Sequence, residues 1–244
     1  MDVIILAGGF AKRMWPLTKN KPKQLLELAG KPMLNYVLDS LNSLDFERII
    51  ISINSFFAPQ FKNYLSSNSE FQKVELFIEE STNENEKLGA LGALNLLFKK
   101  KSIAGPVFIV GGDNLSDFDL KRMVDLYEKS NSDVIGLFDV EDTELAKLYG
   151  IVNLEGNRIV NFVEKPSLPP STLAATAYWL LSKSGINNFF TYIKSGGDTD
   201  AMGNFLSWNV KRSSVLSVSF KGSWFDIGSL ESYSEAQNWL RGRP

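Results

Sequence analysis

The sequence predicts an α/β protein with a Rossmann-like three-layer sandwich, in which helices cover both faces of a mixed, mostly parallel sheet. Three observations lead to this fold class. Short apolar runs alternate with segments of helical periodicity through the first 140 residues. The first of these runs is continuously apolar, as in a strand buried on both faces, and a hairpin signal at Glu155-Gly156-Asn157 adds antiparallel strands. The 244 residues, 44% of them hydrophobic, suffice for a large core.

Strands are expected where short apolar or β-branched runs lie between polar or glycine-rich segments. The run Val3–Ala7 is unbroken, which indicates burial, whereas Val215–Phe220 alternates apolar and polar residues like a half-exposed strand. The expected strands are Val3–Ala7, Arg48–Ile53, Val74–Ile78, Pro106–Val110, Asp133–Val140, Ile151–Leu154, Arg158–Val163, Leu173–Leu181 and Val215–Phe220.

Helices are expected where apolar residues recur every three or four positions. This spacing predicts helices over Met33–Leu41, Phe57–Leu65, Leu88–Lys100, Leu120–Lys129, Gly185–Lys194 and Leu230–Leu240. Pro32 directly precedes the first of them, where proline is well tolerated. The acidic, asparagine-rich stretch Glu79–Lys87 is expected to be an exposed loop.

The composition excludes several kinds of chemistry. There are no cysteines and no histidines, so disulfides, zinc–thiolate sites and imidazole bases are excluded. Carboxylates, lysines, arginines and bound hard cations remain. The net charge of −2 provides no general basic field for nucleic acid. Since no signal peptide or membrane-spanning apolar stretch is recognisable, we expect a soluble, cytoplasmic protein.

The most informative segment directly follows the first strand. Gly8 and Gly9 leave backbone N–H groups accessible, Arg13 can grip phosphate oxygens bidentately, and Lys23 adds a mobile point charge. The glycine spacing matches neither the dinucleotide fingerprint nor the P-loop. A tight turn with solvated basic residues is the alternative interpretation. The combination of glycines, arginine and lysines after a buried strand favours phosphate binding.

Three further motifs place charged residues at strand ends, and each alone has an ordinary structural explanation. Asp113 follows an apolar strand, where it could bind a divalent cation or cap a turn. Glu164 and Lys165 end another strand, where alternation would put them on opposite faces. Asp226 lies among bulky apolar residues, so its burial requires a metal ion or a helix N-terminus as partner.

Taken in order, these motifs resemble the sugar-phosphate nucleotidyltransferases, the nucleoside-diphosphate-sugar pyrophosphorylases of the glucose-1-phosphate thymidylyltransferase and mannose-1-phosphate guanylyltransferase type. The resemblance covers essentially the whole chain. It rests on Leu6-Ala7-Gly8-Gly9 with Arg13, Pro16-Leu17-Thr18, Lys23, Gly30-Lys31-Pro32-Met33, Leu88-Gly89 with Gly92-Ala93, Gly112-Asp113-Asn114, Tyr149-Gly150, Glu164-Lys165-Pro166 and Trp224 with Asp226-Ile227-Gly228. It implies the nucleotide-diphospho-sugar transferase fold in one domain over residues 1–244. Within it, the nucleotide-binding part spans 1–140, the sugar-binding part 141–225 and the closing helix 230–241.

The resemblance also implies an activity and a set of roles. The reaction would transfer NMP from an NTP to a sugar-1-phosphate, giving an NDP-sugar and pyrophosphate, with Mg²⁺ as the cofactor. Arg13 and Lys23 would be catalytic, and Asp113 and Asp226 would hold the metal. The nucleotide-binding residues would be Leu6, Ala7, Gly8, Gly9, Glu80, Gly89 and Asp113. The sugar-phosphate-binding residues would be Asn114, Tyr149, Gly150, Glu164 and Lys165.

Two departures from the family pattern leave the substrate open. Phe10-Ala11-Lys12 stands where many members have a third glycine and a small hydroxyl residue, and the link between Glu79 and Leu88 is longer than usual. GTP, dTTP and UTP all remain candidates, with Glu80 or Glu84 in a slot where glutamate is common among guanine-using members. The expected partners are the NTP and the sugar-1-phosphate, without nucleic acid or membrane. A homo-oligomer remains open, since family members are commonly dimers or tetramers.

Three alternatives differ in activity. A non-catalytic homologue could sense sugar nucleotides or serve as a regulatory subunit, but such proteins often lose the loop arginine or a metal aspartate, and both are present here. A cytidylyltransferase could act on a non-sugar phosphate such as phosphocholine, although those enzymes tend to differ around Glu164-Lys165-Pro166. A glycosyltransferase is a weak alternative, because neither Asp117-Phe118-Asp119 nor Asp198-Thr199-Asp200 ends an apolar strand.

Overall fold

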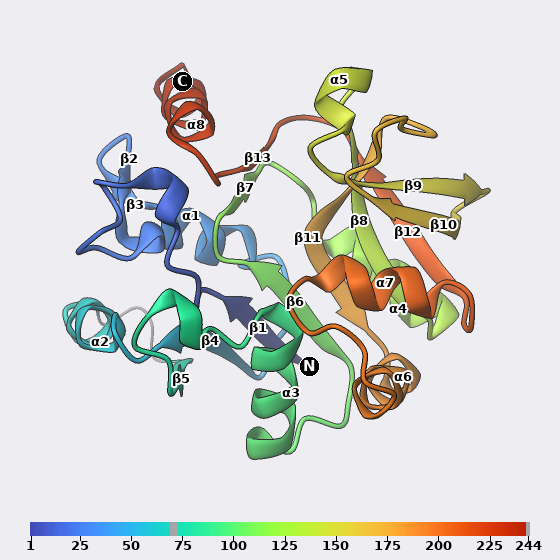
Figure 1. Ribbon diagram of the computed structural model, residues 1–244, viewed down its shortest axis with the longest axis horizontal. Helices are drawn as coiled ribbons and strands as arrows, with labels where there is room; N and C mark the ends of the chain where they lie inside the picture. The colour runs from blue at the N-terminus through green and yellow to red at the C-terminus, as the bar shows by residue number, and fades with distance from the viewer. Residues whose placement is uncertain (69–72, 243–244) are drawn as a thin grey trace. The chain divides into compact units, whose positions relative to one another are not determined.

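The computed structural model describes residues 1–68 and 73–242, which divide into two compact units (Figure 1). The first unit contains Asp2–Lys87, Val110–Phe118 and Gly222–Pro244. The second unit contains Leu88–Ile109 and Asp119–Lys221, together with Met1. Strands and helices alternate in both, so the predicted α/β class with a mixed sheet is confirmed.

The first unit is built on three parallel strands in the order β5-β4-β1. Its elements are β1 (Asp2–Leu6), the 3₁₀ helices η1 (Lys12–Met14) and η2 (Lys23–Leu25), β2 (Glu27–Leu28), β3 (Lys31–Pro32), α1 (Met33–Ser40), β4 (Arg48–Asn54), α2 (Ala58–Ser66), β5 (Val74–Glu79), η4 (Glu84–Glu86), β7 (Asn114–Ser116), β13 (Trp224–Asp226) and α8 (Leu230–Arg241). The register sets Leu6 opposite Ser52 and Asn54 opposite Glu79. The segments that follow these strands therefore begin at one carboxyl edge, where α/β proteins commonly bind ligands.

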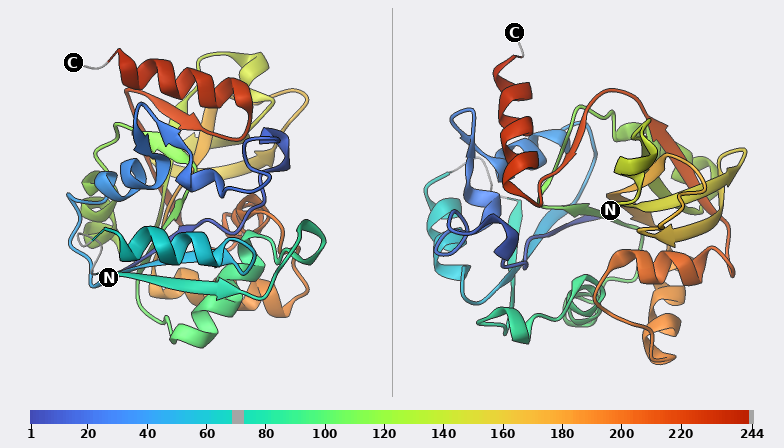
Figure 2. Two further views of the ribbon diagram at one scale, coloured as in Figure 1. Left: turned by 90° about the vertical axis from the view of Figure 1, so that its left-hand side faces the viewer. Right: turned by 45° about the horizontal axis from the view of Figure 1, so that its top comes forward.

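A satellite core holds the loops of this edge in place. It contains the buried residues Met14, Leu26, Leu28, Met33, Leu115, Ile227 and Ala236, with Tyr36, Phe225, Tyr233, Trp239 and Leu240 packed against them. Helix α8 contributes to this core and packs against β2 and β13 (Figure 1). Figure 2 shows the same helix along its length, at the red end of the colour scale. Its start is fixed by a reciprocal cap between Ser229 and Ser232.

The second unit contains a mixed sheet in the order β11-β8-β12-β10-β9. Its elements are α3 (Ala90–Lys101), α4 (Lys121–Ser130), β8 (Asp133–Asp139), α5 (Thr143–Ala146), β9 (Gly150–Glu155), β10 (Arg158–Glu164), β11 (Leu173–Leu181), α6 (Lys183–Lys194), α7 (Met202–Asn209) and β12 (Val215–Phe220), and β6 (Val107–Gly111) runs from this unit into the first. β8 and β12 are parallel, whereas β8–β11 and the predicted hairpin β9–β10 are antiparallel.

Each expected strand and helix is present. The strands Leu173–Leu181 and Val215–Phe220 have the predicted bounds, and the other elements have shifted ends. Val3, Ile4 and Ile5 are completely buried, as the unbroken run at the start of the chain predicts. Helix α7 was not expected, because contacts with residues distant in sequence stabilise it, and these leave no helical repeat of apolar residues in the sequence. The side-chain amide of Asn209 donates to the buried Asp133 at 2.9 Å, and Phe205 packs on Phe189. In the described part of the chain, no helix has the length and apolarity needed to cross a membrane.

Candidate active site

The loop that leaves β1 is tightly bound to the two neighbouring strands. A Cβ on Gly8 would lie 2.7 Å from Oε1 of Glu79, which shows how closely the backbone approaches that carboxylate. The Gly8 carbonyl accepts from the side chain of Asn54 at 2.9 Å, and Ser52 donates to Glu79 at 2.8 Å. Glu79 is 4% exposed, and burial raises its pKa. The loop therefore has a fixed path, with the exposed Gly9 on its outer side.

Replacing Gly8 by alanine is expected to lower the free energy of unfolding by about 1–3 kcal/mol, the usual cost of overpacking. The new methyl group would displace the buried Glu79 carboxylate from Ser52. Gly9→Ala is the matched control, since a Cβ at that position meets nothing within 4 Å. Urea unfolding of both variants measures the difference. Equal stability of the two variants would contradict the tight approach at Gly8.

Lys23 is a buried partner rather than a mobile charge. It is 8% exposed, and its Nζ donates to Oδ2 of Asp113 at 2.6 Å and to the Ile227 carbonyl at 2.7 Å. Asp113 reaches this position because the residue before it is a glycine that packs closely against β1. A Cβ on Gly112 would lie only 2.9 Å from the carbonyl oxygen of Leu6. Lys23 thus links the loop after β1 to Asp113, which follows β6, and to Ile227, which follows β13. Its ammonium group lies at the carboxyl edge of the strands.

The ribbon β7–β13 brings Asp226 beside Asp113. Its register pairs Asp226 with Asn114, although the two are 112 residues apart in sequence. The Asn114 amide donates to Asp113 at 3.1 Å and to Asp226 at 3.3 Å, and its oxygen accepts from the indole of Trp224 at 2.8 Å. Asn114 is 2% exposed, so it acts here as a bridge between two carboxylates. Asp226 does not cap the following helix, because Ser229 does so.

The two aspartates carry more negative charge than their partners neutralise. Burial and the charge of Asp113 raise the pKa of Asp226 to about 6. Burial would also raise the pKa of Asp113, but the charge and hydrogen bond of Lys23 outweigh it and lower this pKa. Two carboxylates of this kind fit Mg²⁺, which is commonly held by one or two carboxylates plus substrate phosphates. The described residues contain no cluster of three or more acidic side chains that could hold a metal ion alone.

Arg13 supplies an accessible positive charge at the same place. Arg13 is exposed, and its guanidinium lies close to Gly228. A Cβ on that glycine would lie 2.9 Å from Nη2 of Arg13. Its charge lowers the pKa of Asp226, against the larger raising effects of burial and Asp113. Within residues 1–68 and 73–242, no carboxylate forms an ion pair with this guanidinium. It is thus available to an anionic ligand.

The predicted sugar-phosphate residues other than Asn114 lie in the second unit. Glu164 ends β10 opposite Gly150 of β9, and Lys165 then turns with a φ of 43°. This turn sets Nζ of Lys165 3.9 Å from Oε1 of Glu164, so the two side chains do not lie on opposite faces. The Lys165 amide donates to the Tyr149 carbonyl at 3.0 Å.

Two glycines make room for the Glu164 carboxylate. A Cβ on Gly150 would lie 3.0 Å from its Oε2, and one on Gly203 of α7 would lie 2.7 Å from it. Both positions also abut the Phe162 ring. The site residue Gly203 was missed from the sequence, since it lies on the unexpected helix.

Gly89 and Glu80 were predicted to bind the nucleotide, and their surroundings do not by themselves indicate a ligand. Gly89 has a φ of 73° and packs against the backbone of Thr199 and Asp200, whose carbonyls accept from the first amides of α3. Local packing thus suffices to explain this glycine. Glu80 is exposed just beyond β5, whereas Glu79 is buried under the glycine loop. Continuing the strand's alternation from Phe77 would have identified Glu79 as inward-facing.

Comparison with known proteins places the chain in a family. A family model described as nucleotidyl transferase matches residues 2–242. A protein of Sulfolobus acidocaldarius, provisionally named mannose-1-phosphate guanyltransferase, is 28% identical over 96% of this chain and 61% of its own length. Mannose-1-phosphate guanylyltransferase 1 of Arabidopsis thaliana is 32% identical over 75% of this chain and 50% of its own length.

The fold comparison agrees. The structure of a provisionally named glucose-1-phosphate thymidylyltransferase of Bacillus anthracis, in complex with sucrose, has a TM-score of 0.85 and 24% identity, covering 100% of this chain and 96% of that one. Because the family model covers residues 2–242, the chain belongs to the nucleotidyl transferase family. It spans about half to two thirds of the length of these curated relatives.

Proposed function

We propose that this protein transfers a nucleoside monophosphate from an NTP to a sugar-1-phosphate and releases pyrophosphate. The observation that carries the proposal is the arrangement of Lys23, Asp113 and Asp226 beside the glycine loop, with Arg13 accessible next to them. Family membership supports it, as do the names of the relatives from Sulfolobus and Arabidopsis.

The chemistry requires no general base. A sugar-1-phosphate oxygen is already an anionic nucleophile, in keeping with a chain that has no histidine. It attacks the α-phosphorus of the NTP, a new O–P bond forms, and the bond between the α-phosphorus and the bridging oxygen of the β-phosphate breaks. The electron pair leaves with pyrophosphate. Catalysis of this type depends on positioning and on stabilising negative charge.

Each group of the first unit has a task in this step. The glycine loop lets the triphosphate approach the backbone closely, and Lys23 stabilises charge at the reacting phosphates. Arg13 binds the departing pyrophosphate bidentately. Asp113 and Asp226 would hold Mg²⁺, which would neutralise phosphate charge when bound. In the second unit, Glu164 and Lys165 would bind the sugar and its phosphate, as the family resemblance implies.

An activity matrix tests this function. The purified protein is mixed with Mg²⁺ and each pairing of GTP, UTP, dTTP, ATP or CTP with glucose, mannose, galactose, heptose or N-acetylglucosamine 1-phosphate. Mass spectrometry then detects NDP-sugar formation. At least one pairing should turn over, and an Asp113→Asn sample provides the background. No NDP-sugar from any pairing would count decisively against nucleotidyl transfer to these sugars.

The raised pKa of Asp226 predicts how metal binding depends on pH. Above about pH 6 the carboxylate is ionised and can bind Mg²⁺, whereas below it a proton competes with the metal. The Mg²⁺ affinity is therefore expected to fall by up to about tenfold for each pH unit below 6. Calorimetric Mg²⁺ titration between pH 5 and 8 measures this, with Asp226→Asn as a control of low, flatter affinity. Equal wild-type affinity at pH 5 and pH 8 would contradict it.

A further inference from the structure

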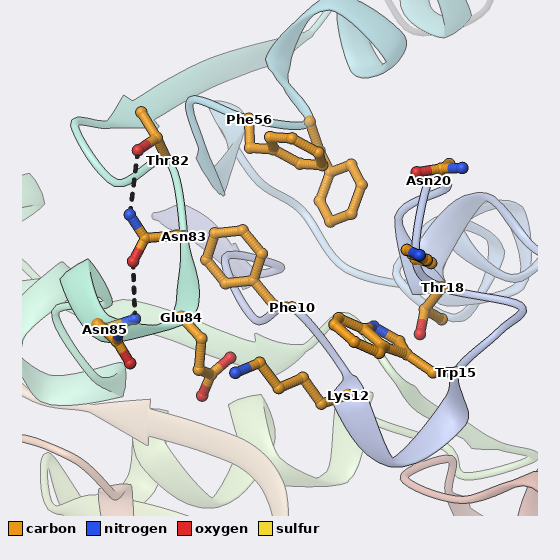
Figure 3. A pocket seen from close by; sticks show the side chains of 12 residues that line it. Phe10, Lys12, Trp15, Thr18, Asn20, Phe56, Thr82, Asn83, Glu84 and Asn85 are labelled. Atoms are coloured by element: carbon orange, nitrogen blue, oxygen red, sulfur yellow. Dashed lines mark hydrogen bonds between the residues drawn. The ribbon is translucent and has the colours of Figure 1, made fainter.

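The two units shape their surfaces differently. In the first unit, a cavity of about 420 Å³ lies beside the glycine loop, walled by residues 10–20, 56–57 and 82–85 (Figure 3). In the second unit, the predicted sugar-phosphate residue Glu164 stands at the end of β10 with its side chain 44% exposed. A half-exposed carboxylate can recognise a ligand only where something fixes its position.

The Glu164 carboxylate receives no hydrogen bond from the protein. Within residues 1–68 and 73–242, neither a side chain nor a backbone amide donates to its oxygens. Its ion-pair partner is Lys165, whose Nζ is 3.9 Å from Oε1, too far for a hydrogen bond. An ionised carboxylate is an acceptor with several lone pairs. Both oxygens are therefore available to the hydroxyl groups of a ligand.

Two glycines confine one of these oxygens by contact alone. A Cβ on Gly203 of α7 would lie 2.7 Å from Oε2 of Glu164 and equally close to Cζ of Phe162. A Cβ on Gly150 of β9 would lie 3.0 Å from the same oxygen and closer still to the ring. Phe162 is 6% exposed and lies two residues before Glu164, on the same face of β10. The carboxylate thus lies between two backbones and beside the edge of a buried ring.

The helix itself gives no reason for a glycine at position 203. Gly203 lies in the first turn of α7, where alanine would favour the helix more. Its φ is not positive, so the backbone conformation does not require glycine either. The close approach to Glu164 and Phe162 is the feature that only glycine permits.

Helix α7 is anchored at both ends and packs along β10 (Figure 1). Before it, the Thr199 carbonyl accepts from two amides of α3 at 3.1 and 3.2 Å, and the Asp200 carbonyl accepts from a third at 2.8 Å. At its end, the side chain of Asn209 donates to the buried Asp133 at 2.9 Å. A larger residue in the first turn would therefore displace the half-exposed carboxylate rather than the helix.

We propose that Gly203 is a positioning residue for sugar recognition. It leaves the space in which the Glu164 carboxylate is set, and this setting determines how tightly the second unit binds the hydroxyl groups of a sugar-1-phosphate. The proposal rests on the proposed function, in which Glu164 binds the sugar. Gly203 acts through Glu164, so helix α7 belongs to the recognition machinery although no sequence motif marks it.

Equilibrium binding tests this without turnover. Calorimetry compares glucose 1-phosphate and mannose 1-phosphate with methyl phosphate, which carries no sugar hydroxyls. Gly203→Ala is expected to weaken binding of a sugar phosphate by about 10- to 150-fold, the range for a hydrogen bond to a charged group, and to leave the weak binding of methyl phosphate unchanged. Gly105→Ala is the matched control, since a Cβ at this glycine of the same unit meets nothing within 4 Å.

A second variant avoids overpacking altogether. Glu164→Asp keeps the charge on an exposed side chain but withdraws the carboxylate from both glycines. If position decides recognition, this variant should lose sugar-phosphate affinity within the same range although it retains its charge. Thermal unfolding accompanies both variants, and the Tm of Gly203→Ala should fall by less than about 8 °C.

A double-variant cycle separates positioning from a general structural effect. Because Gly203 acts through the carboxylate, adding Gly203→Ala to Glu164→Ala should weaken binding by no more than about twofold further. In turnover, Gly203→Ala should raise KM for the sugar-1-phosphate, with KM for the NTP and kcat little changed.

Wild-type affinity in Gly203→Ala and Glu164→Asp would overturn the inference, even in a fully active enzyme. So would a full further loss when Gly203→Ala is added to Glu164→Ala. Absence of turnover together with coupled sugar-phosphate binding would instead contradict only the proposed function.

Discussion

Replacing Arg13 by alanine is expected to lower kcat by about 10³-fold or more, with little change in stability. The guanidinium lies accessible beside Gly228, at the edge that carries Asp113 and Asp226. Charge develops on the departing pyrophosphate, and a bidentate arginine stabilises that charge more in the transition state than in the ground state. Arg13 is exposed and forms no ion pair within the described residues, so its removal should change the stability little.

Steady-state kinetics and thermal unfolding of Arg13→Ala test this prediction together. Arg241→Ala is the matched control, since Arg241 is another exposed arginine of the first unit, on α8. The control should retain the wild-type kcat, whereas Arg13→Ala should retain only the wild-type Tm. A kcat within tenfold of wild type would show that this arginine does not act on the reacting phosphates.

Replacing Asp226 by asparagine is expected to abolish turnover and to stabilise the metal-free protein. Because burial and Asp113 raise the pKa of Asp226 to about 6, the folded state binds a proton there more tightly than the unfolded chain does. This group therefore destabilises the fold above pH 6, and the destabilisation disappears as the pH falls through 6 toward 4. At pH 8 the asparagine variant should gain roughly 1–3 kcal/mol. For a chain of this size, the gain corresponds to a Tm increase of roughly 3–8 °C.

Thermal unfolding in EDTA at pH 8 and pH 5 measures the effect. The difference between Asp226→Asn and wild type should be largest at pH 8 and about half as large at pH 5, because the destabilisation disappears only as the pH falls toward 4. Adding Mg²⁺ should raise the Tm of the wild type only, since binding to the folded state stabilises it. A variant less stable than wild type at pH 8 in EDTA would show that Asp226 is neutralised within the metal-free protein.

Local patterns predicted the framework of the fold well. The unbroken run Val3–Ile5 and the periodic helix α8 depend on neighbours in sequence, and both are present as expected. Helix α7 was missed because its stability comes from contacts such as that of Asn209 with Asp133. A local repeat in the sequence cannot reveal such a contact. The same limit applies to β7 and β13, since each is three residues long and requires the other as a partner.

The candidate site was predictable in its residue types but not in its internal contacts. Motif order singled out Asp113, Asp226 and Lys23, but the sequence could not show that Lys23 is buried against Asp113. Asn114 was predicted to bind the sugar-phosphate, and the sequence could not show that its amide donates to both Asp113 and Asp226. Glu79 was assigned to an exposed loop and is instead buried under Gly8. Lys23 with Asp113, Asn114 with Asp226, and Glu79 with Gly8 are all pairs that lie far apart in sequence.

The most direct test of nucleotidyl transfer is the stoichiometry of pyrophosphate release. With Mg²⁺ and the pair of substrates selected by the activity matrix, pyrophosphate and NDP-sugar are measured in the same sample over time. We predict one pyrophosphate for each NDP-sugar formed, with no release when the sugar-1-phosphate is omitted and none from Asp113→Asn. Pyrophosphate release that does not depend on the sugar-1-phosphate, or that persists in the Asp113 variant, would contradict the assignment of this site.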